Sequence, residues 1–320
     1  MAVRTRYAPD RGLTVRMTAT MFLLGLVFVA FVALIIGIMA ATHSSLGAII
    51  VVALIFGGGT AFISLFYSDK IALAAAGARE VSPRQAPELH AIVDRLCALA
   101  DMDKPRIAIA PTAMPNAFAT GRNSKNSVLC VTDGLLYRSK LTPEELEGVL
   151  AHELSHVAHK DVQVMTYASL LAIVAGLLVR FAFYSEIFGG GRRGGGNSQA
   201  ALLIPLIMLG SALIYAISFL LIRLLSRYRE LAADRSGALL TGNPGALMEA
   251  LKKVSGGMAS IPTKDLRSAE PLNAFYFAPA LRPNGQGLAN IFSTHPSLQK
   301  RLEELAKVQR QLNQATPGDR

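Results

Sequence analysis

Four long apolar runs constrain the fold of this chain more than any other feature. They cover residues 17–41, 46–67, 162–184 and 200–225. About 20 helical residues cross the hydrocarbon core of a bilayer, so each run is long enough to span a membrane. The 320 residues are 52% hydrophobic and only 17% charged, which is more apolar than a soluble globule requires. We therefore predict a mainly α-helical, multi-pass membrane protein with a small β-sheet.

Three other interpretations are disfavoured by the same sequence. The first run is too long for a cleaved signal peptide, whose apolar core is usually about 7–15 residues. The net charge of +10 does not come with a stripe of Lys and Arg interleaved with aromatic residues, so we expect no nucleic acid as a partner. The "GGGRRGGGNS" loop at 189–198 lacks the preceding strand, the following helix and the terminal Lys-Ser/Thr of a P-loop, so we expect no nucleotide.

The arginines indicate how the chain threads the bilayer. They gather before the first span and after the last, as is typical of cytoplasmic flanks. They are Arg4, Arg6, Arg11, Arg16, Arg223, Arg227 and Arg229. With four crossings, both ends of the chain and the segment 68–161 share the cytoplasmic side. The Gly-rich loop then lies outside, although it carries Arg192 and Arg193.

Four segments follow from this threading. Residues 1–67 form a cytoplasmic N-terminus and two transmembrane helices. Residues 68–161 form the first part of a cytoplasmic domain, and 226–320 form its second part. Residues 162–225 form two more transmembrane helices, joined by the Gly-rich outer loop.

The stretch "LTPEELEGVLAHELSHVAH" in the first cytoplasmic part predicts a helix. Thr142 suits the N-cap, Pro143 suits the first helical position, and Glu145 completes a capping box. The stretches "PRIAIAP" and "NSVLCVTDG" predict short strands. We interpret Cys97 and Cys130, the two cysteines, as small buried hydrophobic residues.

The predicted helix carries the pattern H-E-x-x-H. His152 and His156 are four residues apart, so their imidazoles share one helix face and can bind one zinc ion at about 2.0–2.1 Å each. Glu153 lies beside them but is turned aside, where it can act as a general base toward water. The alternative is that two surface histidines and a glutamate coincide on an amphipathic helix.

A catalytic zinc needs a third protein ligand and one open position. In an unbroken helix His159 lies one turn beyond His156, too far along to complete the set. Glu230 and Asp234 follow the last apolar run, and an even number of crossings brings them to the same side as His156. We predict Glu230 as the third ligand and Asp234 as the hydrogen-bond partner of a ligand imidazole. Alternatively, both merely pair with arginines on a juxtamembrane helix.

Four motifs together resemble the HtpX-type membrane zinc metalloproteases, which are gluzincins related to the CAAX prenyl endopeptidases. They are "MPNAFATG", "LTPEELEGVLAHELSHVAHKD", "SRYRELAADRSGALLTG" and "STHPSLQKRLEEL", and the likeness covers most of the chain. It implies a zincin-like catalytic domain with one Zn²⁺ per chain. The positions matching ligands, base and supporting acid are His152, His156, Glu230, Glu153 and Asp234.

Two further sets of residues enter only through this resemblance. The run Asn116, Ala117, Phe118 and Ala119 matches a strand beside the cleft, whose exposed backbone would pair with an extended substrate. An ordinary edge strand under a loop is the alternative. His295 and Arg301 match positions that help hold the tetrahedral intermediate, although His295 would equally cap the helix that carries Arg301. The stretch "PLNAFYFAP" departs from the family pattern.

Motif and resemblance together predict a membrane-bound zinc metalloendopeptidase. It would hydrolyse peptide bonds at the cytoplasmic face of a bacterial inner membrane, in membrane-protein quality control. The expected partners are the lipid bilayer and membrane-protein or unfolded polypeptide substrates. Two alternatives stay open: a processing protease for one dedicated substrate, lipid-modified ones included, and a non-catalytic metal-binding scaffold.

Overall fold

The structure, a computed structural model, describes residues 11–42, 59–170, 172–174, 176, 198–259, 277 and 293–315. The chain divides into two compact units. The first comprises residues 1–15, 65–163 and 226–320, and the second comprises residues 16–64 and 164–225. Each unit is described by itself below.

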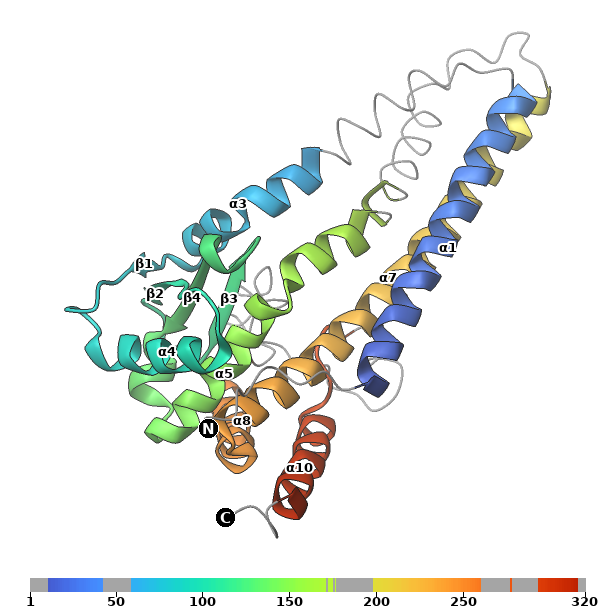
Figure 1. Ribbon diagram of the computed structural model, residues 1–320. Coiled ribbons are helices and arrows are strands. Elements are labelled where there is room, and N and C mark those ends of the chain that lie inside the picture. The colour runs from blue at the N-terminus through green and yellow to red at the C-terminus, as the bar shows by residue number, and fades with distance from the viewer. Residues whose placement is uncertain are drawn as a thin grey trace. The chain divides into compact units, whose positions relative to one another are not determined.

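Helices make up most of the described chain, as Figure 1 shows. They are α1 (Arg11–Thr42), α3 (Gly59–Ala76), α4 (Pro87–Ala100), α5 (Pro143–Ala158), α7 (Ser198–Thr241), α8 (Pro244–Ala259) and α10 (Leu298–Ala315), with the short helical turns η2 (Ser124–Asn126) and η3 (Gly134–Arg138). The expectation of a mainly helical protein with a small sheet is confirmed.

The first unit contains one four-stranded mixed sheet, ordered β1-β2-β4-β3. Its strands are β1 (Arg79–Glu80), β2 (Arg106–Ala110), β3 (Ala117–Gly121) and β4 (Ser127–Thr132). Strand β2 runs parallel to β4, whereas β1 and β3 run antiparallel to their neighbours. This order leaves β3 at one edge of the sheet, and α5 packs against that strand.

Helix α5 carries the H-E-x-x-H pattern and begins where the sequence predicts. The Thr142 hydroxyl accepts from the Glu145 N–H at 3.3 Å, and the Glu145 carboxylate accepts from the Thr142 N–H at 2.8 Å, which completes the capping box. Leu150 and Leu154 are fully buried on α5. Besides β3, the helix packs against α4 and α8. This burial fixes α5 in the core of the first unit.

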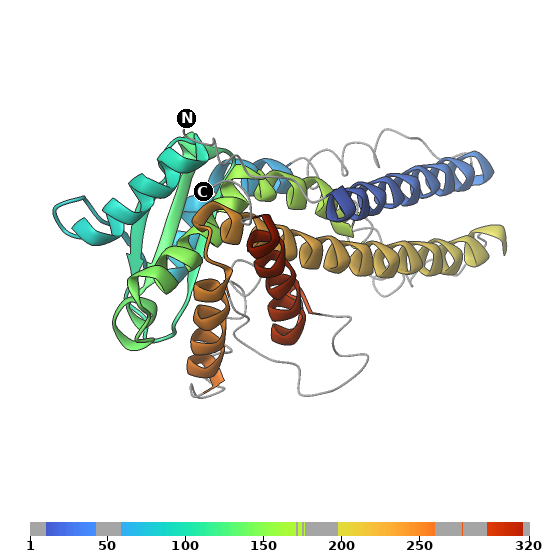
Figure 2. The ribbon, with the colours of Figure 1, turned by 60° about the horizontal axis from the view of Figure 1, so that its bottom comes forward.

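Helix α7 approaches α5 closely at Gly237. A Cβ atom added to Gly237 would lie 2.8 Å from the backbone nitrogen of His152, so only glycine permits this approach. Glu230 and Asp234 precede Gly237 by about two turns and one turn of helix. The close packing therefore brings both carboxylates beside α5. Beyond α7, helices α8 and α10 lie side by side (Figure 2).

The second unit is formed by apolar helices. Leu24 of α1, Ala168 and Leu225 of α7 form its buried cluster. Large side chains elsewhere on these helices are exposed, among them Phe22 at 66% and Leu209 at 70%. Apolar side chains on the outside of a helical unit are typical of contact with lipid.

Among the residues that the structure describes, two helical stretches are long and apolar enough to cross a membrane. They are Arg11–Phe31 and Leu209–Thr241, and a shorter apolar helix covers Asp161–Val174. Much of the predicted spans 46–67 and 162–184 lies outside the described residues. Four crossings therefore stay a prediction.

Both cysteines are buried, as the sequence analysis expects. Burial raises the pKa of the Cys97 thiol to about 11 and that of the Cys130 thiol to about 12. Each is therefore a neutral thiol at pH 8 in the folded protein, and reagents that attack thiolates should leave both alone.

Replacing Gly237 with alanine should destabilise the first unit. The added methyl group overlaps the backbone of α5, and overpacking of this kind typically costs about 1–3 kcal/mol. Gly256→Ala on α8 is the matched control, because its added Cβ meets no atom within 4 Å. Alanine there should be neutral or slightly stabilising. Calorimetry of both variants in detergent measures the difference, and equal melting temperatures would contradict the close approach of α7 to α5.

Candidate metal centre

Three side chains from α5 and α7 gather around one point in the first unit. The Nε2 atoms of His152 and His156 are 3.2 Å apart. Oxygens of Glu230 lie 3.8 Å from Nε2 of His152 and 3.5 Å from Nε2 of His156. In the described part of the chain, these three residues form a group whose potential ligand atoms all lie within 4.8 Å of one another.

These separations fit a tetrahedral metal ion. Bonds of about 2.0–2.1 Å at tetrahedral angles place neighbouring ligand atoms roughly 3.3 Å apart. His152 is fully buried and Glu230 nearly so, whereas His156 is partly accessible. Burial lowers the pKa of His152 to about 4. Its imidazole is therefore neutral at pH 7, which is the form that binds a metal.

A carboxylate holds the second ring nitrogen of each histidine. Asp234 of α7 lies 2.9 Å from Nδ1 of His152, and Asp161 lies 2.5 Å from Nδ1 of His156. Such a partner fixes the tautomer with the proton on Nδ1 and leaves Nε2 as the electron-pair donor. Both Nε2 atoms therefore face the centre of the group.

An arginine in turn holds each of these carboxylates. Arg301 of α10 donates two hydrogen bonds to Asp234, at 2.7 and 2.8 Å. Arg229 of α7 lies 2.9 Å from Asp161. Burial alone would raise the pKa of Asp161, but the Arg229 charge and the His156 hydrogen bond lower it overall. Asp161 is thus ionised at neutral pH and can accept a hydrogen bond from Nδ1–H of His156.

Glu153 lies between the ligand group and strand β3. Its Oε2 atom accepts a hydrogen bond from the Ala119 N–H at 3.0 Å. Its Oε1 atom is buried without a hydrogen-bond partner among the described residues. Burial and the nearby Glu230 charge hold the pKa of Glu153 well above its usual range. A carboxylate with one anchored and one unoccupied oxygen can take up and return a proton.

His295 lies behind Glu230 in the structure. Its Nδ1 atom is 2.9 Å from Oε2 of Glu230, and the side chain is buried. The Ser297 hydroxyl accepts the Lys300 N–H at the start of α10, so the capping role that the sequence left open for His295 is performed by serine. His295 therefore contacts a predicted metal ligand, and its expected role in holding a tetrahedral intermediate stays a prediction.

Arg301 is buried, and its expected role in holding a tetrahedral intermediate stays a prediction. Its guanidinium lies against Asp234 and the Phe277 carbonyl, which accepts from Nη1 at 2.6 Å. Its Nη2 atom lies 3.5 Å from Nδ1 of His152. Arg301 thus reaches the metal group through His152 and its partner Asp234.

The strand predicted to hold substrate, from Asn116 to Ala119, lies at the sheet edge but is not exposed. Asn116, Ala117 and Phe118 are fully buried, and Ala119 is 8% exposed. The Ala117 carbonyl accepts from the Phe277 N–H at 3.0 Å. Part of the expected pairing edge is therefore already occupied by the chain itself.

The sequence analysis did not identify Asp161, because it treated the helix as continuing unbroken beyond His156. Helix α5 ends at Ala158, and Lys160 takes the left-handed conformation with φ of 57°. This turn directs Asp161 back to His156. Phe277 was also missed, since its stretch departs from the family pattern. His159, excluded as a ligand, lies instead 3.4 Å from the Ser236 hydroxyl.

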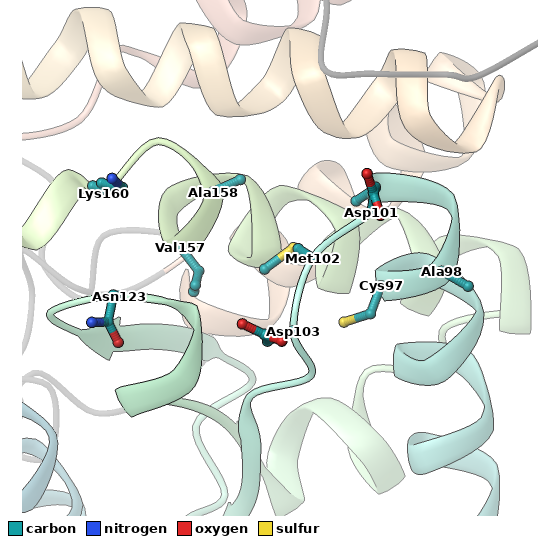
Figure 3. A pocket seen from close by; sticks show the side chains of 10 residues that line it. Cys97, Ala98, Asp101, Met102, Asp103, Asn123, Val157, Ala158 and Lys160 are labelled. Carbon is teal, nitrogen blue, oxygen red and sulfur yellow. The ribbon is translucent and has the colours of Figure 1, made fainter.

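A separate pocket of about 670 Å³ opens at the C-terminal ends of α4 and α5 (Figure 3). It is lined by Cys97, Ala98, Ala100, Asp101, Met102, Asp103, Asn123, Val157, Ala158 and Lys160. None of these residues belongs to the group formed by His152, His156 and Glu230. The pocket is therefore distinct from the metal centre.

Comparison with known proteins agrees with this chemistry. The sequence profile described as Peptidase family M48 matches residues 83–309. The chain is 55% identical over 318 residues to Protease HtpX homolog 1 of Streptomyces coelicolor, covering 99% of each. It is 49% identical over 313 residues to Protease HtpX homolog of Moorella thermoacetica, covering 98% of this chain and 99% of the relative.

A solved structure is also similar, the crystal structure of S. mikatae Ste24p. The match has a TM-score of 0.47 and 17% identity, and it covers 92% of this chain and 66% of that one. The resemblance to HtpX-type proteases is confirmed by the profile and by the near full-length relatives. The chain therefore belongs to peptidase family M48 and is a membrane metalloprotease.

Proposed function

We propose that the chain is a zinc endopeptidase in which His152, His156 and Glu230 hold the metal and Glu153 is the general base. One observation carries the proposal. Three potential ligand atoms meet at tetrahedral spacing, and Glu153 has an unpartnered oxygen beside them. This three-residue set leaves a coordination position open, as a catalytic zinc requires. We interpret this constellation in the first unit as the catalytic part of the zincin-like domain that the sequence predicts.

A zinc ion held by this set would supply a Lewis acid that polarises a peptide carbonyl and acidifies water. Glu153 accepts the proton of the attacking water on Oε1 and returns it to the leaving amine. The Ala119 N–H keeps Oε2 in place during both transfers. The His156 side chain is partly accessible, whereas that of His152 is fully buried.

The surrounding residues position the reacting groups. Asp234 and Asp161 hold the two imidazoles with Nε2 toward the metal, and His295 steadies Glu230. Arg301 keeps Asp234 ionised and in place. Changes to such partners typically cost about 10–100-fold in metal affinity or activity.

The arginines flanking the apolar runs support a site at the cytoplasmic face of a bacterial inner membrane, with four crossings and domain parts at 68–161 and 226–320. Substrates are then cytosolic segments of membrane proteins or unfolded chains, as in membrane-protein quality control. A dedicated processing protease for one substrate is the second candidate, because the edge of β3 is partly closed. A structural metal scaffold would need a fourth protein ligand, and among the described residues the group comprises His152, His156 and Glu230.

Glu153→Gln should abolish proteolysis while zinc stays bound. The amide cannot accept the proton, and general acid–base catalysis contributes about 10²–10⁴-fold. Cleavage of a casein-like unfolded chain by purified protein in detergent measures the loss, and metal analysis checks the zinc. Wild-type activity in this variant would exclude the mechanism. If the wild type cleaves one candidate peptide but no unfolded chain, the dedicated protease is favoured.

Glu230→Ala should lose zinc, because it removes one of three ligands. The loss should exceed the about 10–100-fold cost of removing a hydrogen-bonding partner behind a ligand. Glu249→Ala is the control, since Glu249 lies on α8 with an exposed ion pair to Lys252. Zinc content by mass spectrometry measures both variants. Absorption spectra of cobalt-substituted wild type that indicate four protein ligands would instead support the scaffold.

The proposed threading places Asn197 outside and Arg138 inside. Because the native thiols are buried with raised pKa values, an impermeant maleimide should label only an introduced cysteine. In intact cells, Asn197→Cys should react and Arg138→Cys should react only after lysis. The opposite pattern, or labelling of both from one side, would contradict four crossings with a cytoplasmic site.

A further inference from the structure

One face of helix α3 is exposed although it carries aromatic and aliphatic side chains. From Leu65 onward this helix belongs to the first unit, and its opposite face packs on the core of that unit through Ala72 and Leu73. The exposed side chains recur at helical spacing and are Phe66, Tyr67, Lys70 and Ile71. Aromatic and basic side chains together are typical of the boundary between a bilayer and water.

Arg122, in the turn after β3, reaches this exposed face from another part of the chain. Its guanidinium lies over the Phe66 ring, with 4.6 Å between Cζ and the ring centroid. Lys70 lies over the Tyr67 ring, with Nζ 5.4 Å from the centroid. Phe66 and Lys70 are four residues apart and so share one face of α3. Two cations are therefore gathered on the exposed rings.

In the described part of the chain, neither Arg122 nor Lys70 has a carboxylate partner. Asp69, which precedes Lys70, pairs instead with Arg106, and Arg106 also binds Glu80. A guanidinium stacked on a ring keeps its N–H groups available at its edge, where they can donate to two oxygens of one phosphate group. Charge complementarity therefore favours an anion on this face of α3.

The position of Arg122 relates this face to two of the predicted spans. Phe66 lies at the end of the predicted span 46–67, and Gln163 lies at the beginning of the predicted span 162–184. The Gln163 side chain donates to the Arg122 carbonyl at 2.6 Å, while the Phe66 ring lies under the guanidinium. Arg122 thus contacts both points where a predicted span leaves the bilayer, which is the depth of the lipid headgroups.

We propose that Arg122 and Lys70 form a binding site for the phosphate of an anionic phospholipid. The guanidinium takes the phosphate through two N–H donors, and Lys70 adds a second positive charge. The rings beneath the cations, with Ile71, contact the first part of the acyl chains. Anionic lipids are found in the cytoplasmic leaflet, which is the leaflet that the predicted threading gives to this face.

The lipid site is continuous with the strand beside the metal centre. Arg122 follows Gly121, the last residue of β3, and in the same strand the Ala119 N–H donates to Glu153. Gly121 has a φ of 130° and packs against the backbone of Asn126, so this turn requires glycine. A lipid bound to Arg122 therefore fixes the end of β3 relative to the membrane surface.

The test uses a fluorescent reporter inside the proposed site. The chain contains no tryptophan, so Phe66→Trp introduces a single one, and tryptophan is the ring that best keeps a cation–π contact with Arg122. Full-length protein with this change is reconstituted into bilayers of phosphatidylcholine and phosphatidylglycerol. Bromine atoms on the acyl chains of one lipid at a time quench the reporter. The two quenching curves give the relative binding constant of phosphatidylglycerol over phosphatidylcholine.

Four further substitutions are made in the Phe66→Trp protein. Arg122→Gln and Lys70→Gln each remove one charge of the site, whereas Arg122→Lys keeps the charge but loses the paired donors. Arg84→Gln is the matched control, because Arg84 is exposed between β1 and α4 and its loss changes the net charge equally. Thermal unfolding checks that each variant is folded. If Arg122→Gln does not fold, Arg122→Lys and Lys70→Gln carry the comparison.

The Phe66→Trp protein should prefer phosphatidylglycerol. Arg122→Gln should lower the relative binding constant by about 5-fold, which corresponds to the roughly 1 kcal/mol that one basic residue contributes at an anionic surface. Lys70→Gln should lower it less, Arg122→Lys should give an intermediate value, and Arg84→Gln should leave it unchanged. Inorganic phosphate, compared with sodium chloride at equal ionic strength, should leave the preference intact.

The proposal is overturned if neither brominated lipid quenches the reporter, because the exposed face then does not meet the bilayer. Equal binding of the two lipids overturns it too, as does an equal loss in Arg84→Gln, which indicates net charge alone. If inorganic phosphate abolishes the preference, a soluble phosphate compound is the occupant. None of these measurements uses zinc or cleavage, so failure of the proposed function appears separately, as missing proteolysis with the lipid preference intact.

Discussion

The close approach of α7 to α5 at Gly237 is the constraint on which the site depends. Backbone meets backbone there, since a Cβ atom on Gly237 would lie 2.8 Å from the His152 nitrogen. Because α7 is regular, fixing Gly237 also fixes Glu230 and Asp234, about two turns and one turn away. One carboxylate then faces Nε2 of His152 and the other faces its Nδ1. A predicted metal ligand and the carboxylate partner of another predicted ligand are thus placed by one packing contact.

The balance of buried charges affects the protonation of the groups in this site. Glu153, Glu230, Asp234 and Asp161 are buried around the site, and among the described residues the guanidinium groups of Arg301 and Arg229 pair with two of them. Burying unpaired charge is costly, so protons or a cation would stabilise the remaining carboxylates. Burial, and after it the nearby Glu230 charge, raises the pKa of Glu153. A divalent ion between the imidazoles and Glu230 would offset this charge and leave Glu153 able to exchange protons with water.

Whether the sequence could predict a residue of the site depends on how far its partners lie from it along the chain. His152, Glu153 and His156 lie within about one helical turn, so their spacing alone places them together. Glu230 needed the topological argument of an even number of crossings and the family resemblance. Asp161 is close in sequence but was missed, because a left-handed Lys160 turns the chain without a glycine. Phe277 had no sequence signal, since its contacts with Ala117 and Arg301 join segments far apart in the chain.

The sequence by itself determined the apolar helices, the capped helix from Pro143 and the residue types of the candidate metal site. These features depend on local periodicity, capping and spacing, which can be read from the order of the residues alone. Only the tertiary structure decided that Arg301 pairs with Asp234, that His295 contacts Glu230 and that the Ala117 carbonyl at the edge of β3 accepts from Phe277. Each of these joins segments far apart in the chain through a buried contact. The free energy of such contacts depends on how whole helices pack, and residue order alone does not express it.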